Sequence, residues 1–152
     1  MQLRGTDPLS LAEVEIFGTP RAPYTAMEIW RHQHFGSYDN SGVAADDYDA
    51  DFDGIVNLIE YATGLDPNVS QATRPIEMRW NAGETELEVV FNRIDDSLLN
   101  YVLQSTDDLS STDWDPVWSG TGTANESVSV PESAWPSGQP SYFFRLKISR
   151  DE

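Results

Sequence analysis

The chain has no cysteine, few basic residues and no long apolar run, and each absence excludes a class of protein. The lack of cysteine excludes disulfides and thiolate zinc sites. Only 9 basic residues oppose 26 acidic ones, so the net charge of −17 repels nucleic acid and anionic membrane surfaces. No stretch reaches the roughly 20 apolar residues that span a bilayer. We therefore expect no nucleic-acid partner and no membrane insertion, and a divalent cation is the natural partner of so acidic a chain.

Three regions of the 152-residue chain differ in their residue pattern. The chain is 39% hydrophobic and 11% aromatic, which is enough for a buried core. Residues 1–20 predict an amino-terminal pair of strands, residues 21–70 have a helical pattern, and residues 71–152 alternate between apolar and polar. The predicted fold class is α+β. We expect a short helix–loop–helix segment followed by a small antiparallel β-sandwich, with the strand pair as an extra element.

The middle region carries the start and stop signals of two helices. Thr25 with Glu28 three residues later forms a capping box, and Gly36 predicts the end of the first helix. Ala26, Ile29 and Trp30 share one face of that helix. A second helix is predicted after Gly54 on a 3.6-residue apolar pattern that ends at Gly64, formed by Ile55, Leu58, Ile59 and Ala62.

Beyond Ser70, six short segments alternate between apolar and polar residues. The predicted strands are residues 76–80, 86–92, 101–105, 115–119, 127–130 and 142–148. Glycine and proline between these segments mark turns, which favours a sandwich of antiparallel strands. Trp30 and Trp80 lie within apolar patterns and are predicted to be core residues.

Residues 49–60 fit the calcium-loop pattern D-x-D-x-D-G-x5-E at every specified position. Calcium takes six to eight oxygen ligands, which a single loop supplies from alternate positions. Gly54 permits the positive φ angle of the turn. The predicted ligands are the carboxylates of Asp49, Asp51 and Asp53, the backbone carbonyl of Ile55, Asn57 directly or through water, and both carboxylate oxygens of Glu60.

An acidic loop in an acidic protein can also be merely solvated. Here a glycine, an asparagine, a glutamate and a following helical pattern occupy the required positions, which a chance run of acids would not supply. Just upstream, Asp46 and Asp47 are predicted to act as outer-sphere charge or as a helix-start cap, with Asp47 a further candidate ligand. Calcium sensing needs a paired site and a groove that opens, so we interpret this ion as structural.

The loop and the helix after it resemble dockerin and thrombospondin type 3 calcium repeats. Residues 30–67, with H-F-G, S-G-V-A-A-D and N-L-I-E-Y-A-T-G-L-D-P, resemble a carboxy-terminal segment of large exported proteins of Verrucomicrobia- and Planctomycetes-type bacteria. The runs Y-V-L-Q-S-T-D-D-L from Tyr101 and Y-F-F-R-L from Tyr142 resemble strands of that family's β-rich tail. Phe52 departs from the family, which usually has glycine at this loop position.

Residues 2–18 resemble the last two strands of a discoidin (coagulation factor 5/8 type C) domain. Most of such a domain would be missing here, so its ligand loops are not carried over. An incomplete sandwich leaves strand edges unpaired. We therefore expect that these strands belong to a longer protein, or that they dock on this chain's own sandwich or on a neighbouring subunit.

The sequence shows no catalytic pattern, and we expect no enzyme. It lacks a phosphate-binding glycine loop, a G-x-S-x-G elbow and an H-E-x-x-H motif. His32 and His34 are two residues apart and so lie on different helix faces. Beside predicted turns, a tryptophan ring can either stack on a sugar or pack at a strand end, and this applies to Trp114, Trp118 and Trp135.

The leading interpretation is a non-catalytic, calcium-stabilised module that serves as a spacer, anchor or sorting tail outside the cell or on its surface. One alternative is a subunit of a surface filament or layer, which adds its amino-terminal strands to the sheet of the next copy. Another is a module that binds cell-surface polysaccharide. The first residues lack the features of a secretion signal, so we expect either a removed signal or a longer protein.

Overall fold

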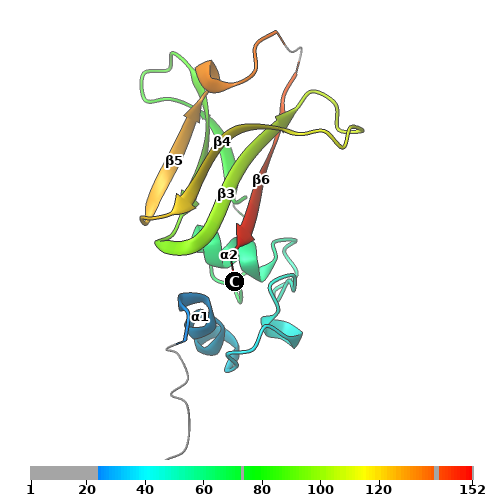
Figure 1. Ribbon diagram of the computed structural model, residues 1–152. Helices are drawn as coiled ribbons and strands as arrows, with labels where there is room; N and C mark the ends of the chain where they lie inside the picture. Colours follow the sequence, from blue (N-terminus) through cyan, green and yellow to red (C-terminus); the bar gives the residue numbers. More distant parts are fainter. Residues whose placement is uncertain (1–23, 73, 139–140, 152) are drawn as a thin grey trace, which may run out of the picture.

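The computed structural model describes residues 24–72, 74–138 and 141–151. Two short helices lie at one end of a β body that consists of two antiparallel sheets of three strands each (Figure 1). The fold class is therefore α+β, as the sequence predicted. The strand pair predicted for residues 1–20 lies outside the described residues. Within the described ranges, no helix has both the length and the apolar character needed to cross a membrane.

Both predicted helices are present and end at the predicted glycines. Helix α1 (Ala26–Phe35) begins with the expected capping box: the Glu28 N–H donates to Thr25 Oγ1 at 3.2 Å, and the Thr25 N–H donates to Glu28 Oε2 at 2.7 Å. Helix α2 (Asn57–Thr63) follows the acidic loop. Gly36 (φ 73°) and Gly64 (φ 74°) adopt the left-handed conformation that closes each helix. A 3₁₀ turn, η1 (Gly42–Ala44), lies between them.

The buried face of α1 differs from its most apolar face. Met27 and Arg31 are buried, whereas Ile29 is 45% exposed. The guanidinium of Arg31 donates to the carboxylate of Asp46 and forms an ion pair with it. A long arginine stem can lie inside when its charged head finds a carboxylate. The ion pair therefore helps to hold α1 in place, and the pattern of hydrophobic residues did not predict it.

All six predicted strands are present, and they form two sheets. Sheet A has the strand order β1–β2–β5 and sheet B has the order β4–β3–β6. The strand β1 has the predicted bounds, while β3 begins five residues earlier than predicted because it also pairs with β4 at Asp96. The elements are β1 (Ile76–Trp80), β2 (Leu87–Arg93), β3 (Asp96–Thr106), β4 (Asp115–Gly122), β5 (Glu126–Pro131), the 3₁₀ turn η2 (Glu132–Ala134) and β6 (Phe143–Arg150).

Side chains of both sheets and both helices belong to one hydrophobic cluster. Phe91 of sheet A lies 5.2 Å from Trp118 and 6.5 Å from Tyr101, both of sheet B, measured between ring centroids. Because this core is shared, the loop between the helices is anchored to the β body. The buried members are Met27, Tyr61, Ala62, Val89, Phe91, Leu99, Tyr101, Leu103, Val128, Val130, Trp135 and Ile148.

The prediction that Trp80 is a core residue was wrong. Trp80 is 57% exposed, although it lies opposite Leu87 on the face that sheet A turns to the core. Alternation assigns a residue to a face of its sheet but does not say whether anything covers that face. Trp30 is half-buried and packs against the core, with its ring 5.4 Å from that of Tyr61.

Candidate metal centre

The loop of residues 49–60 turns sharply before it enters α2. Gly54 has φ 92°, in the region that favours glycine. Phe52 also has a positive φ of 65°, and its side chain is 81% exposed. A left-handed conformation costs a non-glycine residue about 1–2 kcal/mol. The backbone at Phe52 is thus in a conformation that glycine would adopt without strain.

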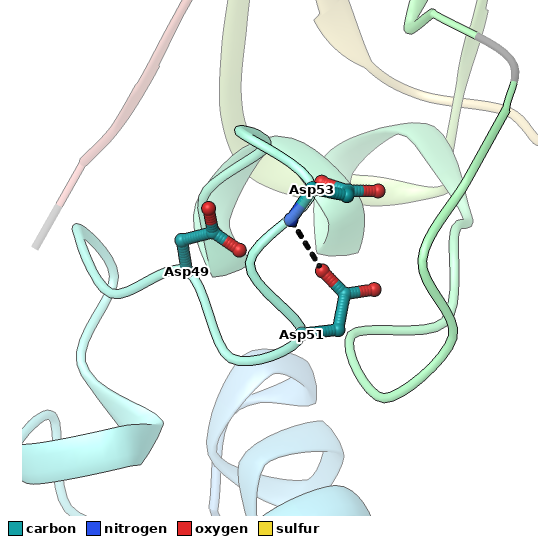
Figure 2. Close-up of side chains that lie close together, drawn as sticks. All are labelled: Asp49, Asp51 and Asp53. Atoms are coloured by element: carbon teal, nitrogen blue, oxygen red, sulfur yellow. Dashed lines mark hydrogen bonds between the residues drawn. The ribbon is translucent and has the colours of Figure 1, made fainter.

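Three aspartates converge along this loop (Figure 2). Asp49, Asp51 and Asp53 each present a carboxylate oxygen, and these oxygens all lie within 4.8 Å of one another. Backbone amides orient them. Asp49 accepts from the N–H groups of Phe52 and Gly54 at 2.8 Å each, Asp51 from Asp53 at 3.1 Å, and Asp53 from Ile55 at 2.8 Å. The loop therefore folds its backbone around a concentration of negative charge.

Asn57, in the first turn of α2, is fully buried and its side-chain amide is fixed in orientation. Its Nδ2 donates to the carbonyl oxygens of Val43 at 2.9 Å and Ala45 at 2.7 Å. Both amide hydrogens are thereby used, which leaves Oδ1 as an acceptor without a partner. The N–H of Asn57 donates to the carbonyl of Tyr48 at 2.8 Å. The asparagine thus presents one free oxygen.

Glu60 is fully buried, and neither of its carboxylate oxygens has a hydrogen-bond partner. Within the described ranges, every buried side-chain oxygen that lacks a partner belongs to Glu60, Asn57 or Asp51. A buried carboxylate without a partner is among the most costly groups in a protein interior. The orphan oxygens belong to three of the residues predicted as ligands. The carboxylates whose oxygens lie within 4.8 Å of one another are those of Asp49, Asp51 and Asp53, and Glu60 is not among them.

The electrostatics of Glu60 show the same concentration of charge. The pKa of Glu60 is raised from 4.5 to about 7, most of all by burial and then by the negative charges of Asp51, Asp53, Asp49 and Asp66, in that order. These carboxylates are close enough to repel one another. A divalent cation among them would reverse the repulsion and favour the ionised form of Glu60.

Ile55, whose backbone carbonyl was predicted as a ligand, is a buried residue. Asp46 does not join the aspartates: its carboxylate pairs with Arg31, and its carbonyl accepts from the Leu58 N–H at 3.0 Å in the first turn of α2. The N-cap residue of α2 is Val56, and no side chain caps this helix. Asp47 is exposed and lies outside the cluster of carboxylate oxygens that can meet at one ion.

Two buried tyrosine hydroxyls join α2 to the β body. The hydroxyl of Tyr61 donates to Asp96 Oδ2 at 2.6 Å, and the hydroxyl of Tyr101 donates to the carbonyl of Ala62 at 2.8 Å. Burial raises the pKa of Tyr61, and the hydrogen bond to Asp96 raises it further. Sequence analysis missed these contacts because the partners lie more than 30 residues apart. The residue after Glu60 is thus fixed to a strand of sheet B.

The loop is also tied to the segment that leads into β1. Asp53 Oδ2 accepts from the N–H of Gln71 at 2.7 Å. Asp46 and Tyr61, on either side of the loop, contact α1 and sheet B. A rigid loop would therefore also hold α1, α2 and the segment before β1 in place.

The histidines and turn tryptophans have other partners. His32 stacks on Tyr38 with 4.2 Å between ring centroids, and His34 Nδ1 lies 3.5 Å from Asp66 Oδ1. Trp135 is buried and Trp118 packs edge-on against Phe91. The guanidinium of Arg145 lies 4.2 Å from the ring centroid of Trp114. Trp135 is therefore withdrawn from solvent, and one face of the Trp114 ring lies against a guanidinium.

The comparisons with known proteins add no relative. No protein-family model matches the chain, and neither the curated proteins nor the solved structures include a match to it.

Proposed function

We propose that residues 49–60 bind one calcium ion, and that this ion holds the two helices against the β body. The observation that carries the proposal is the set of orphan buried oxygens on Asp51, Asn57 and Glu60, beside the converging carboxylates. A hard cation with six to eight oxygen ligands satisfies this donor set. Zinc prefers nitrogen and sulfur ligands, which the loop does not offer. Calcium fits better than magnesium because a bidentate carboxylate suits its larger, more flexible coordination shell.

The role we propose for the ion is structural rather than catalytic. Glu60 is followed directly by Tyr61 and Ala62, which lie in the hydrophobic core. Binding at the loop therefore fixes the helix that supplies these core side chains. We further propose that the two sheets pack face to face as a β-sandwich, which the shared core and the contact of Phe91 with Trp118 support.

As a whole, the chain would serve as a non-catalytic spacer, anchor or sorting module outside the cell or on its surface. Calcium sites of extracellular modules work with dissociation constants of about 10⁻⁴–10⁻³ M, because calcium is abundant there. A structural ion needs such steady occupancy. The very acidic surface, with a net charge of −17, suits a calcium-rich medium in the same way.

Calorimetric titration with calcium chloride tests the proposal. The wild-type chain should bind one ion, and saturation at a hundredfold above the dissociation constant should stabilise it by about 2.7 kcal/mol relative to a sample in EGTA. Asp51→Asn should weaken binding strongly. The matched control Asp47→Asn removes the same charge from an exposed neighbour and should bind as the wild type does. The absence of a binding isotherm, or a melting temperature that is the same in EGTA and calcium, would contradict the proposal.

A further inference from the structure

Two adjoining hollows form one cleft between α1 and the end of the β body at which β4 turns into β5 (Figure 1). Their volumes are about 560 and 390 Å³, and both are lined by Gly64, Ile94 and Asn125. Sites for small molecules have volumes of about 300–1,000 Å³. The cleft is therefore large enough for a ligand, and its course from α1 to β5 suits an elongated one.

An indole ring lies at the α1 end of the cleft. Trp30 is half-buried and lines the larger hollow. The rings of His34, Phe35 and Tyr61 lie near it, with interplanar angles of 45°, 77° and 60° respectively. Each therefore meets the indole tilted or edge-on, and no described ring is stacked parallel to it. A flat ligand thus has no stacked ring to displace from the indole face.

Polar side chains continue the cleft from the indole toward β5. Gln33, Asn92 and Asp95 are exposed, and their side chains form no hydrogen bond with any described residue. Asn125 Oδ1 accepts from the N–H of Asp95 at 2.8 Å, which orients the amide and leaves Nδ2 as a donor. An amide group can donate and accept, as a hydroxyl can. The cleft therefore presents donors and acceptors that match the hydroxyl groups of a ligand.

The charges in the cleft favour an uncharged ligand. Arg93 forms an ion pair with Glu126, and His34 lies 3.5 Å from Asp66, so the basic groups of the cleft already have acidic partners. An acidic ligand would also meet the repulsion of a chain with net charge −17. A cationic ligand would find the carboxylate of Asp95 but would offer no acceptor to the amide donors. A ligand with many hydroxyls and no charge meets all these conditions.

We propose that this cleft binds a neutral polysaccharide, with one sugar ring on the indole of Trp30 and the following sugars along Asn125 and Asn92. A pyranose ring has an apolar face of C–H groups that packs on an aromatic ring, and its rim of hydroxyls both donates and accepts hydrogen bonds. None of the predicted calcium ligands lines the cleft, so the inference goes beyond the proposed ion. It identifies the kind of surface that the proposed anchor would hold.

Affinity electrophoresis of the full-length chain tests the proposal, in native gels with calcium chloride that contain a β-glucan, a galactomannan, an arabinoxylan or a dextran. At least one of these neutral polymers should slow the wild-type chain relative to a gel without polymer. Asn92→Ala/Asn125→Ala removes two amides at exposed positions and should weaken binding roughly tenfold. Trp30→Ala should abolish the retardation. Because Trp30 also packs against the core, circular dichroism checks that each variant is folded.

Two matched controls should be retarded as the wild type is. Thr112→Ala/Ser133→Ala removes two exposed polar side chains that do not line the cleft, and Trp114→Ala removes an indole that lies against Arg145 instead. The proposal is overturned if none of the four neutral polymers retards the wild type, or if Asn92→Ala/Asn125→Ala is retarded equally. Retardation by polygalacturonate in place of the neutral polymers would also overturn it and would assign the cleft to an acidic ligand.

Discussion

Replacing Glu60 with glutamine should have opposite effects on stability with and without calcium. Glutamine has nearly the same shape but no charge, so the substitution isolates the charge of a fully buried carboxylate. Without metal, that charge is repelled by Asp51, Asp53 and Asp49. With metal, the same charge is the proposed bidentate ligand. A residue with a purely steric role would show no such reversal.

The magnitude without calcium follows from the pKa. The pKa of Glu60 in the folded chain is about 7, above the 4.5 of an ordinary glutamate, so the folded state binds the proton more tightly than the unfolded state. The stability that this proton binding adds to the folded state is fully present below pH 4.5 and is lost as the pH rises to about 7. The difference corresponds to about 3 kcal/mol at pH 8. Glu60→Gln should therefore raise the stability of the metal-free chain by up to about 3 kcal/mol at that pH.

With calcium the sign should reverse. At a hundredfold excess over its dissociation constant, calcium should stabilise the wild type by about 2.7 kcal/mol, and the variant should lose most of this gain. Urea unfolding at pH 8, followed by tryptophan fluorescence in EGTA and in calcium, measures both effects. Glu132→Gln, at an exposed position, is the matched control and should change neither.

Two results would refute this reasoning. A Glu60→Gln variant that is less stable than the wild type in EGTA at pH 8 would show that the buried charge is not a cost to the metal-free fold. An unchanged gain from calcium would show that Glu60 is not a ligand.

Three further substitutions test the backbone and the anchors of the loop. Phe52→Gly should stabilise the chain by about 1 kcal/mol in urea unfolding, because the left-handed position is relieved and little packing is lost at an exposed side chain; equal or lower stability would contradict the strain. Tyr61→Phe should destabilise by about 1–3 kcal/mol, since Asp96 loses its buried donor; a neutral effect would show that this bond does not hold α2. Arg31→Leu should lower the melting temperature with a loss of about 1–3 kcal/mol, because it leaves the Asp46 carboxylate unpaired. An unchanged melt would refute that role.

The parts of the molecule that the sequence predicted are those that depend on near neighbours. Gly36 and Gly64 end their helices because the requirement for a left-handed residue is local. The six strands follow from alternation, which sets the face of each side chain within its own strand. The spacing of the loop residues predicted that Asp49, Asp51 and Asp53 would lie close together, and their carboxylate oxygens do converge. Asn57 and Glu60 are buried with oxygens that lack a partner, and their part in binding an ion stays a prediction.

The parts that the sequence did not predict depend on what packs against a residue from far along the chain. Trp80 has the alternation of a core residue, but no described strand of sheet B covers it. Arg31 has the charge of a surface residue, yet its partner Asp46 lies 15 positions away and allows it to be buried. The contact of Tyr61 with Asp96 spans 35 positions. Hydrophobic periodicity contains no information about such pairs.

The shortness of α2 has a consequence for how the protein matures. A helix of 7 residues is not stable by itself in water, so its persistence depends on what holds its two ends. Its first turn carries Asn57 and Glu60, which we propose as calcium ligands, and its second turn carries Tyr61 and Ala62, which lie in the core. Because both turns belong to one short helix, they form and unfold together. Under the calcium binding proposed above, a chain synthesised where calcium is scarce would complete its core only in a medium rich in calcium, so the calcium concentration of its surroundings would determine when folding is finished.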